Sequence, residues 1–565
     1  MKRTLLGDLK TFSLGQTVSV SGWVSFARRH KEITFIGLSD YSGSTQVVVT
    51  GDLQTKLGDV VSVQGILARK HGRENELEIT AQQVTLENLS KHPLPIEHRS
   101  MTQNQTPQQR DNSLKYRYLD LRMRPHLLRN LWIRNEVSIA MRNILNHNLG
   151  FLEVETPTLF KSTPEGAREF LVPVSRSNIQ DSPKFYSLVQ SPQQYKQMLM
   201  VAGVDRYFQF ARCYRDEGGR ADRQPEFTQL DLEISFVRQS SDVEQIVEAI
   251  VHQGWKAAHE RFPSVIPPPP LLPFPRFKLE ELMKKYGSDK PNLTYGLEIV
   301  DLKMIQVPHL REVLSRKETS ELKALLLQQQ LIDNFEDQKE DIILTTNENG
   351  LLRLGKARQI VADIMRKKNI ELPKGLINPF SPFWVEDFNL FELNEGRIQS
   401  VHHPFTAPIL DHRAKLEVIL QQLEQATTSE KKHEIQKSLI TDIRGLHYDL
   451  VCDGVELGGG SIRNHSSQLQ KSIFMNALGM SHNDCDQKFG HLLDALSYGA
   501  PPHGGFALGF DRFIALLTKS FSIADTLAFP KSSVGTDPLT GAPSSLSIEE
   551  ESEVLSRFGL QKKSD

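Results

Sequence analysis

The sequence contains little cysteine and no long apolar segment. Of its 565 residues only three are cysteines, Cys213, Cys452 and Cys485, and they lie far apart. This spacing gives neither a disulfide framework nor a zinc-binding pattern, so a reducing compartment fits. No run approaches the roughly eighteen apolar residues that a membrane-spanning helix needs, and no segment repeats. We therefore expect neither a membrane protein nor a repeat protein.

Neither sign of charge dominates the composition. Lys and Arg number 67 and Asp and Glu 69, for a formal net charge of −2, with 39% apolar residues. This describes an ordinary globular protein, without the general basic excess of many nucleic-acid-binding proteins, so any RNA contact must come from local patches. The length predicts about two to four domains. Strand-like sequence begins by Thr17, which leaves too little room for a convincing transit peptide.

The residue pattern changes several times along the chain. Five short alternating segments between Thr17 and Thr85 predict a small β-barrel, and the polar stretch from 90 to 112 is typical of a linker. Apolar residues then recur at helical spacing from about Leu127 to Asn148, before Gly150. A proline-rich connector follows at 267–277. The charged stretch at 411–446 predicts a pair of solvated surface helices.

The charged stretch RDEGGRADRQPEFTQLDLE, from Arg215 to Glu233, lies between two segments of alternating residues. The alternation predicts two strands joined by a polar loop. On this interpretation Arg215 and Glu217 share one face, with Gln229 and Asp231 nearby. The alternative is a solvated hairpin with surface ion pairs, which are common and weak.

Two further motifs combine polar side chains with glycine or a helix start. In QSPQQYK, Gln193 and Lys196 lie on one face if a helix begins after Pro192. In DLVCDGVELGGGSIR, Asp449 and Glu456 bracket a strand and a turn. The three glycines that follow permit a ligand to approach the backbone, or they form only a bulge or tight turn.

The remaining motifs contain histidine and arginine. In HHPF, His402 and His403 are adjacent, and in an extended strand they would point to opposite faces, so we expect a polar contact from one rather than a metal site. PPHGGFALGFDRFIALL joins a glycine-rich strand to an amphipathic helix with Arg512 at its N-terminal end. A helix N-terminus with an arginine suits phosphate.

Together these motifs resemble the class II aminoacyl-tRNA synthetases, and specifically the aspartyl-tRNA synthetases of bacterial and mitochondrial type. YRDEGGRADRQPEFTQLDLE is similar to motif 2 of the family, GFALGFDR to motif 3 and GFLEVETPTL to motif 1. TPEGAREFLVP, SPQQYKQMLM, HHPFTAP, ELGGGSIR and AFPK also match, so the resemblance runs from about residue 17 to 535.

The resemblance implies an α+β multidomain fold. The expected parts are an OB-fold anticodon-binding barrel (1–90), a linker (91–125), a catalytic domain in two segments (126–289 and 396–535), an inserted α+β domain (290–395) and a C-terminal extension (536–565). The catalytic domain would have an antiparallel sheet flanked by helices. Motif 1 lies at a two-fold interface in this family, so we expect a homodimer. We expect Val137, on the helix before it, to face the partner or the core beside it.

The resemblance also implies a reaction in two steps. L-aspartate and ATP give aspartyl-adenylate and pyrophosphate, and the 3′ end of tRNA(Asp) then takes the aspartyl group. The first step needs alignment and stabilisation of charge on phosphorus. The catalytic roles would fall on Arg215, Glu456 and Arg512. The ATP contacts would include Arg215, Glu217, Gln224, Glu456, Gly509, Phe510, Asp511 and Arg512, with Asp449 and Glu456 holding Mg²⁺.

Recognition of the amino acid is implied in the same way. Asp231 and Gln193 would receive the substrate ammonium, Lys196 and Arg463 its side-chain carboxylate, and Arg215 its α-carboxylate. His402 would lie close by, and Glu165 would sit on a mobile loop. Asparagine would leave two cations poorly paired; at about 1.5 to 3 kcal/mol for each lost contact, this predicts discrimination of roughly a hundredfold or more.

In the barrel, the resemblance makes Phe35 a stacking platform for a base of the anticodon, with Arg28 and Gln46 reading base edges and phosphate. The alternative is that Phe35 belongs to the barrel core. Gly218 and Gly219 resemble mitochondrial rather than bacterial members, which favours the mitochondrial matrix over a bacterial-type cytoplasm. The 290–395 insert is shorter than the usual bacterial one, whereas 411–446 is longer.

Two other functions are considered. One is a relative that charges asparagine or lysine; the cationic pair of Lys196 and Arg463 argues against it, because a lysine site would need carboxylates there. The other is an inactive relative that only binds RNA, which predicts loss of Arg215, Glu456 or Arg512. All three are present.

Overall fold

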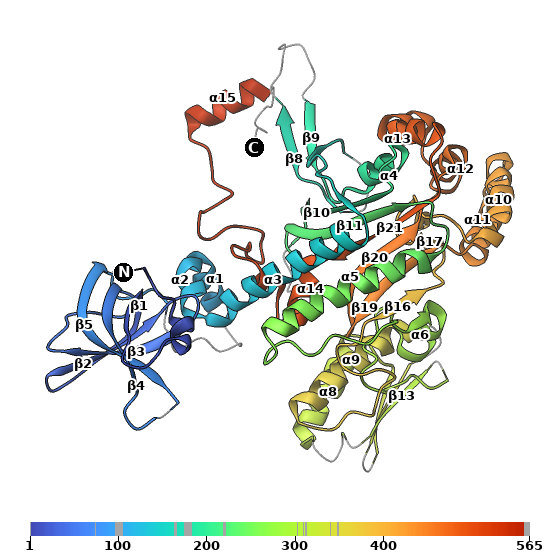
Figure 1. Ribbon diagram of the computed structural model, residues 1–565. Helices are drawn as coiled ribbons and strands as arrows, with labels where there is room; N and C mark the ends of the chain where they lie inside the picture. The colour runs from blue at the N-terminus through green and yellow to red at the C-terminus, as the bar shows by residue number, and fades with distance from the viewer. Residues whose placement is uncertain are drawn as a thin grey trace. The chain divides into compact units, whose positions relative to one another are not determined.

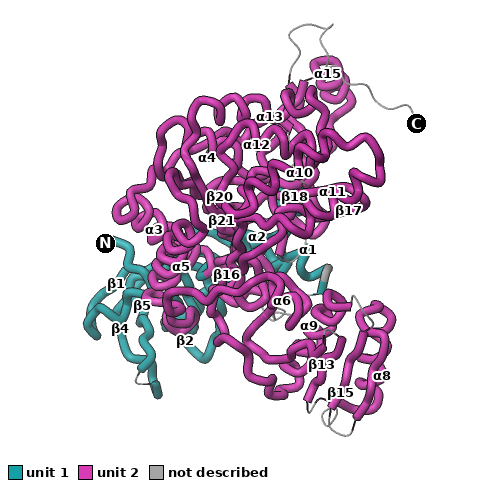
Figure 2. Tube along the Cα trace, turned by 90° about the vertical axis from the view of Figure 1, so that its right-hand side faces the viewer, with its two compact units in different colours: residues 1–129, 537–542 teal, residues 130–536, 543–565 magenta. Residues whose placement is uncertain are grey.

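The computed structural model describes residues 2–73, 75–96, 106–162, 167–174, 184–218, 222–301, 303–308, 310, 314–338, 341–346 and 350–558. Contacts divide the chain into two units, which Figure 2 colours separately: residues 1–129 with 537–542, and residues 130–536 with 543–565. Among the helices of the described ranges, none has the length and apolarity to cross a membrane.

The first unit contains a closed five-stranded barrel with the strand order β1-β2-β3-β5-β4. The strands are β1 (Thr17–His30), β2 (Ile33–Ser39), β3 (Ser44–Thr50), β4 (Val60–Arg69) and β5 (Leu77–Asn88). Alternate side chains such as Val18, Val20, Ile36 and Leu38 are fully buried inside it, because successive residues of a strand point to opposite faces. The predicted barrel is confirmed, with longer strands than the alternation indicated.

The predicted linker at 90–112 contains the start of a helix. Helix α1 (Pro107–Lys115) begins at Thr106, whose hydroxyl accepts from the backbone N–H of Gln109 in a capping box, a motif that satisfies two otherwise unpaired N–H groups. Helix α2 (Arg117–Met123) follows, with Asp120 fully buried between Arg117 and Arg124. A segment predicted as a linker from its polar composition therefore contains part of a helix. Residues 97–105 of the segment lie outside the described part.

The second unit is organised around an eight-stranded sheet with the order β12-β16-β19-β20-β21-β11-β10-β6 (Figure 1). The strands are β6 (Leu152–Glu153), β10 (Arg206–Tyr214), β11 (Glu226–Ser235), β12 (Arg276–Lys278), β16 (Phe383–Glu386), β19 (His447–Cys452), β20 (Val455–Ile462) and β21 (His503–Gly509). From β16 to β10 all neighbours are antiparallel, and only the outermost strands pair in parallel. The expected antiparallel sheet is thus confirmed.

Helices cover this sheet and form its core. Helices α3 (Pro125–Asn143), α5 (Ser240–Arg261) and α14 (Phe510–Leu517) contribute Val137, Trp255 and Phe513, among others, to one apolar cluster with the sheet strands. The predicted helix at 127–148 is confirmed: α3 continues as a π-helical turn at Ile144–Asn148. Gly150 then takes a left-handed conformation (φ 69°) that ends it.

The inserted region has a core of its own, built from residues between Tyr295 and Met365. Its elements are β13 (Met304–Val307), α8 (Arg316–Gln328), β14 (Asn334–Asp337), β15 (Ile342–Thr345) and α9 (Leu351–Lys367), packed beside α6 (Leu279–Tyr286). The three strands form a separate antiparallel sheet. The region is therefore α+β as expected, and the chain has returned to the large sheet by β16.

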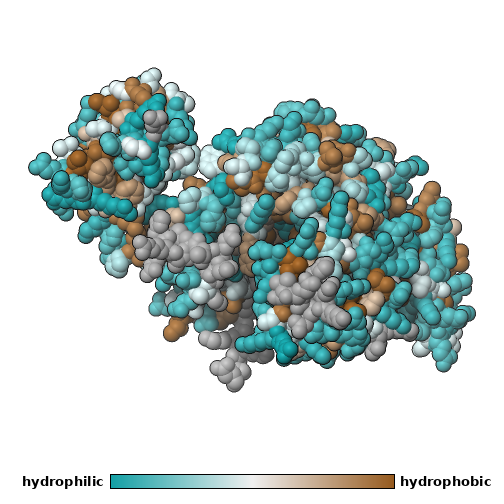
Figure 3. Space-filling view, turned by 90° about the horizontal axis from the view of Figure 1, so that it is seen from below, coloured by the Kyte–Doolittle hydropathy of each residue, from teal (hydrophilic) through white to brown (hydrophobic). Residues whose placement is uncertain are grey.

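The charged stretch at 411–446 does form two helices, α10 (Arg413–Gln425) and α11 (Ser429–Asp442). Their inner faces are not solvated: Leu416, Leu420 and Leu439 are buried in a cluster with the β17–β18 hairpin (Phe391–Asn394 and Arg397–Ser400). On the face drawn in Figure 3, apolar residues are scattered among hydrophilic ones. The solvated interpretation therefore holds only for the outer faces of these helices.

Candidate functional site

The candidate site lies on the middle strands of the large sheet. The predicted hairpin is confirmed: β10 and β11 are antiparallel, with Gln209 opposite Asp231. Strand β10 ends at Tyr214, so Arg215 and Glu217 follow it rather than belong to it. A pocket of about 270 Å³ opens there, lined by Arg215, Glu217, Asp222, Arg223, Gln224, Phe227, Thr228, Gln229, His402, Glu456, Leu457, Gly458, Gly459, Ala507, Gly509, Asp511, Arg512 and Ile523.

Arg215 is the cation best placed to receive an anionic ligand. Its backbone N–H donates to the carbonyl of Pro225 (2.9 Å), and its guanidinium carbon lies 5.1 Å from the centre of the Phe227 ring. The buried Nε has no hydrogen-bond partner among the described residues. Because a buried donor is costly when unpaired, this N–H is available to a phosphate or carboxylate.

Arg512 and Glu456 meet at another wall of the pocket. Arg512, in the first turn of α14, donates from Nη1 to the carbonyl of Glu456 (3.2 Å) and pairs with Asp222 (3.3 Å). The Glu456 carboxylate lies 2.9 Å from the ammonium of Lys290, which also contacts Asp289 (2.7 Å). Burial opposes the charge of Lys290, but Glu456 and Asp289 outweigh it and raise the lysine pKa. Sequence reasoning missed Lys290, which lies in the turn after α6.

Other residues expected at the nucleotide hold the framework of the pocket. Phe510 is 2% exposed, packs edge-on against Phe210 and is not among the residues that line the pocket, so its contact with ATP stays a prediction. Asp511 accepts from the backbone N–H of Thr228 (2.9 Å) and from Arg134, while Gly509 lines the pocket.

Gln224 and Glu217 also have protein partners. The Gln224 side chain accepts from the backbone N–H of Lys531 (2.8 Å) and donates to the carbonyl of the same residue (3.2 Å). Glu217 pairs with Arg223 (2.6 Å). Contacts of these two residues with ATP remain predictions.

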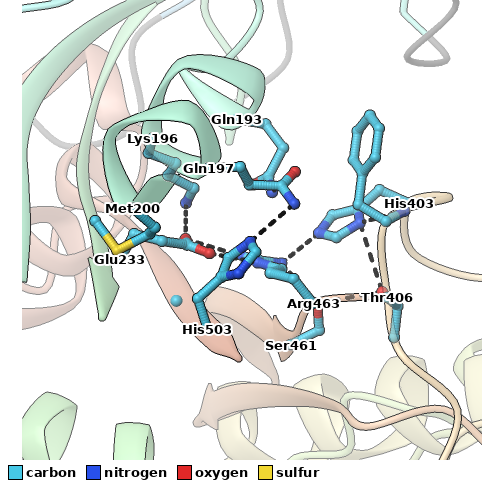
Figure 4. Close-up of polar contacts among 12 residues, drawn as sticks. Gln193, Lys196, Gln197, Met200, Glu233, His403, Thr406, Ser461, Arg463 and His503 are labelled. Carbon is cyan, nitrogen blue, oxygen red and sulfur yellow. Dashed lines mark hydrogen bonds and ion pairs between the residues drawn. The ribbon is translucent and has the colours of Figure 1, made fainter. Parts of the chain in front are cut away.

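Four charged side chains form a buried cluster next to the pocket, and Figure 4 shows three of them, Lys196, Glu233 and Arg463. The ammonium of Lys196, on α4 (Gln193–Val201), lies 3.0 Å from Asp231 and 3.5 Å from Glu233. Arg463 donates from Nε and Nη2 to the two oxygens of Glu233, at 2.9 and 3.1 Å. All four are at most 1% exposed, and two positive charges balance two negative ones. Such a cluster is stable only because every charge is paired.

Glu233 changes the interpretation of the two cations. Sequence reasoning left Lys196 and Arg463 without protein partners, whereas both contact Glu233. The signal was present, because Asp231 and Glu233 are two residues apart on β11 and share a face. The pKa of Glu233 is raised by burial, but Arg463 and Lys196 outweigh burial and lower it.

Asp231 retains one unpaired oxygen. Its Oδ1 accepts from Lys196, whereas its buried Oδ2 lacks a hydrogen-bond partner in the described ranges. Gln193 and Gln197, on the same helix face, bond to each other (3.1 Å), and Gln197 contacts His503 (3.2 Å). An ammonium group is the natural partner for a carboxylate oxygen left free in this way.

The prediction that His402 and His403 point to opposite faces is wrong. Their segment is a bend rather than a strand, and the ring centres are 4.5 Å apart. His403 Nε2 accepts from Arg463 Nη1 (2.5 Å), whereas His402 lines the pocket. Desolvation by the surrounding protein, and then the neighbouring His447, lower the pKa of His402, although its side chain is exposed at the pocket.

Asp449 and Glu456 lie on the neighbouring strands β19 and β20, with Asp449 opposite Gly459. Burial raises the pKa of Asp449, and its Oδ1 lies 3.0 Å from His447 Nε2. Carboxylate oxygens are the ligands that Mg²⁺ prefers, so this pair fits the ion. His402, His447 and Asp449 also offer ligand atoms within 4.8 Å of one another. The two rings are nearly parallel (12°), however, so their in-plane lone pairs do not converge on one ion.

In the barrel, Phe35 does not belong to the core. Thr34 and Ile36 are buried on the inner face of β2, and Phe35, between them, is half-buried on the outer face. Arg28 is its cross-strand neighbour on β1, and Gln46 on β3 donates to Glu78 (2.9 Å). The three residues expected at the anticodon therefore lie on neighbouring strands. Glu165, expected on a mobile loop, lies outside the described residues.

A central antiparallel sheet that carries an arginine-lined pocket, accompanied by a five-stranded barrel, defines a class II synthetase fold. Comparison with known proteins agrees. Residues 109–533 match the family "tRNA synthetases class II (D, K and N)", and residues 18–87 match "OB-fold nucleic acid binding domain". The chain belongs to this class II tRNA synthetase family.

The similar proteins cover nearly the whole chain. The Homo sapiens protein "Aspartate--tRNA ligase, mitochondrial" is 36% identical over 96% of this chain and 88% of its own length. The Dictyoglomus turgidum protein "Aspartate--tRNA(Asp/Asn) ligase" is 39% identical over 98% of both. A crystal structure of asparaginyl-tRNA synthetase from Pyrococcus horikoshii, complexed with asparaginyl-adenylate, aligns with a TM-score of 0.60 over 94% of this chain and 98% of its own. At 18% identity this last likeness concerns the fold.

Proposed function

We propose that this chain is an aspartate–tRNA ligase, which activates L-aspartate with ATP and transfers it to the 3′ end of tRNA(Asp). Relatives that are named aspartate–tRNA ligases and match over most of their length support the proposal. The observation that carries it is the buried cluster of Lys196, Asp231, Glu233 and Arg463 beside a pocket that contains Arg215. It offers a free carboxylate oxygen for an ammonium and fixed cationic donors for a carboxylate.

Activation depends on alignment and on stabilisation of charge. An oxygen of the aspartate α-carboxylate attacks the α-phosphorus of ATP, and the bond from phosphorus to pyrophosphate breaks. Arg215, whose Nε has no hydrogen-bond partner within the described ranges, contacts the α-phosphate and the substrate carboxylate. Arg512 faces the γ-phosphate from the first turn of α14. Both arginines stabilise negative charge that develops away from water.

Asp449 and Glu456 would hold Mg²⁺. When bound, the ion neutralises phosphate charge. Glu456 contacts the ammonium of Lys290 through Oε2 (2.9 Å), and its other carboxylate oxygen could serve as the ligand.

Aspartate is selected by the hydrogen-bond donors that Lys196 and Arg463 present beside their buried carboxylate partners. Most N–H groups of Arg463 already donate to protein acceptors. Glu233 accepts from Nε and from one N–H of Nη2, and His403 and Ser461 accept from Nη1. One Nη2 hydrogen and the Lys196 ammonium then face the substrate side chain. Neither residue can accept a hydrogen bond. A carboxylate satisfies both donors, whereas the amide NH₂ of asparagine would oppose one of them.

The barrel supplies the second RNA contact. A base of the anticodon stacks on the outward ring of Phe35, and Arg28 and Gln46 contact base edges and phosphate. Their position on the outer faces of neighbouring strands supports this role. Stacking of one base on an aromatic side chain contributes about 1 to 3 kcal/mol.

A homodimer formed through motif 1 completes the proposal. Val137 is fully buried and packs toward Gly254 of α5, so it belongs to the protein's own core rather than to an interface. The exposed apolar side chains near motif 1 are Ile139 (46%), Leu152 (56%) and Leu159 (44%). A two-fold contact would bury them against their counterparts.

The compartment is proposed from the relatives, which include mitochondrial and bacterial enzymes. We propose the mitochondrial matrix as its compartment. Detection of the protein in the cytoplasmic fraction of bacterial cells would overturn this proposal.

Charging of tRNA tests the proposed activity. The purified chain is incubated with ATP, Mg²⁺ and labelled aspartate, with transcripts of tRNA(Asp), tRNA(Asn) and tRNA(Lys) as separate acceptors. We expect aspartate on tRNA(Asp). If tRNA(Asn) is also charged, the chain would use both acceptors, as the name of the Dictyoglomus turgidum relative states for that protein. If no acceptor is charged, the result would support the inactive, RNA-binding alternative.

A further inference from the structure

His447 connects two functional groups that come from different parts of the chain. It opens β19, is 6% exposed, and lies between the ring of Phe388 (centres 4.0 Å apart, 21°) and that of His402 (4.2 Å, 12°). Its Nε2 lies 3.0 Å from Oδ1 of Asp449. His447 thus contacts both the pocket histidine and the buried carboxylate.

The geometry shows why this position matters. His447 and Asp449 are two residues apart on one strand and therefore share a face. Across the sheet, a Cβ atom added to Gly459 would lie 2.5 Å from Asp449 Oδ1 and 3.3 Å from His402 Nε2. These two polar atoms thus approach the same small space, which exists because residue 459 lacks a side chain. A shift of either group would change the shape of that space.

The chemistry of the ring suits both contacts. A neutral imidazole can donate from Nε2 to a carboxylate while its flat face stacks on a neighbour. In His447 the Nε2 atom lies 3.0 Å from the Asp449 carboxylate, and the face of the ring lies on His402. Its buried Nδ1 has no hydrogen-bond partner among the described residues, so Asp449 alone fixes which nitrogen carries the proton.

We propose that His447 is a positioning residue that orients His402 for aspartate through stacking and Asp449 for Mg²⁺ through its N–H, and so couples the amino-acid and metal sides of the pocket. This inference rests on the proposed function, in which His402 lies at aspartate and Asp449 at the ion. His447 itself touches neither ligand in this assignment. Its effect is therefore on affinity and on coupling.

Two substitutions separate the two contacts. His447→Phe keeps a flat ring between Phe388 and His402 but removes the N–H that faces Asp449. His447→Gln keeps an amide N–H within reach of Asp449 but removes the ring. Phe388→Leu is a third variant that weakens the stack from its far side, without altering any group at the ligands.

The readouts are the aspartate KM and the Mg²⁺ concentration for half-maximal rate in ATP–pyrophosphate exchange. Direct binding of Mn²⁺ with a non-hydrolysable ATP analogue, followed by electron paramagnetic resonance with and without aspartate, supplies a measurement independent of turnover. For His447→Phe we expect an increase of about tenfold in the Mg²⁺ requirement and little change in the aspartate KM. For His447→Gln and Phe388→Leu we expect the aspartate KM to rise about three- to tenfold, with little change in the Mg²⁺ requirement.

Loss of the coupling between aspartate binding and Mn²⁺ binding is a result that a purely structural role of His447 would not produce. In the wild type, aspartate should strengthen Mn²⁺ binding, and by reciprocity Mn²⁺ should strengthen aspartate binding. Both His447 variants should lose most of this effect while they melt within a few degrees of the wild type. The proposal is overturned if the variants change both parameters in the same proportion, if neither changes, or if a folded variant keeps the coupling. Absence of aspartate-dependent exchange in the wild type would instead overturn the proposed function, and the Mn²⁺ measurement distinguishes the two failures.

Discussion

Replacement of Glu233 by glutamine tests whether the buried charge cluster shapes the substrate pocket. Glu233 is fully buried, binds Arg463 through both oxygens, and lies 3.5 Å from the Lys196 ammonium. The amide keeps the size of the side chain but leaves two buried cations with one carboxylate, that of Asp231. Removal of one partner from a buried ion pair costs about 3 to 5 kcal/mol. For a unit of this size we expect the melting temperature to fall by roughly 3 to 10 °C.

Glu226→Gln is the matched control, because it makes the same change on the same strand. Glu226 pairs with Arg212, but the two side chains are 42% and 41% exposed. An exposed pair contributes about 0 to 1 kcal/mol, so this variant should melt close to the wild type. In exchange assays Glu233→Gln should raise the aspartate KM and narrow the preference for aspartate over asparagine, whereas Glu226→Gln should change neither.

The pH dependence of Glu233→Gln has a defined sign. Because the folded-state pKa of Glu233 is lowered, its stabilisation is present above the ordinary glutamate pKa and is lost as the pH falls through the folded-state value. The difference in melting temperature between wild type and variant should therefore be largest near pH 7 and decrease below about pH 4. Scanning calorimetry across this range measures it. A Glu233→Gln variant as stable and selective as Glu226→Gln would refute the reasoning.

Three other predictions address the phosphate contact, the barrel and the assembly. Arg215→Ala should lose about 2.7 to 4 kcal/mol of transition-state stabilisation in pyrophosphate exchange, by analogy with one oxyanion donor; a rate within tenfold of wild type would contradict the assignment. Phe35→Ala should weaken charging of tRNA(Asp) by about 1 to 3 kcal/mol and leave exchange unchanged, and an equal loss in both assays would make it structural. Ile139→Asp should convert a homodimer of twice 64.1 kDa to a monomer, as measured by light scattering. Val137→Asp should instead lower the melting temperature, because it places a charge in the core. A wild-type chain that is monomeric and fully active would exclude the dimer.

The barrel could be predicted because its signal is local. In β1 and β2, alternate residues such as Val18, Val20, Ile36 and Leu38 face one closed interior, and a strand of alternating burial is visible within a few residues. The hairpin of β10 and β11 followed for the same reason. The helix start at Thr106 was not recognised, because a capping box of polar residues has the composition of a linker.

The site was harder to predict where its contacts join distant parts of the chain. Glu233 and Arg463 are separated by 230 residues, and nothing local to either shows that they form a pair. His402 and His403 were assigned opposite faces because the period of a strand was assumed, whereas the chain bends there. Helical spacing identified an apolar face on α3 but could not show that Val137 faces α5 while Ile139 is exposed.

Amino-acid-dependent ATP–pyrophosphate exchange by the purified chain tests the central claim most directly, because it requires neither tRNA nor the barrel. Parallel reactions would contain L-aspartate, L-asparagine or L-lysine, with Arg215→Ala as the inactive control. The account predicts rapid exchange with aspartate, at least about a hundredfold slower exchange with asparagine at equal concentration, and none with lysine. Exchange that is as fast with asparagine as with aspartate, or absent with all three, would contradict it.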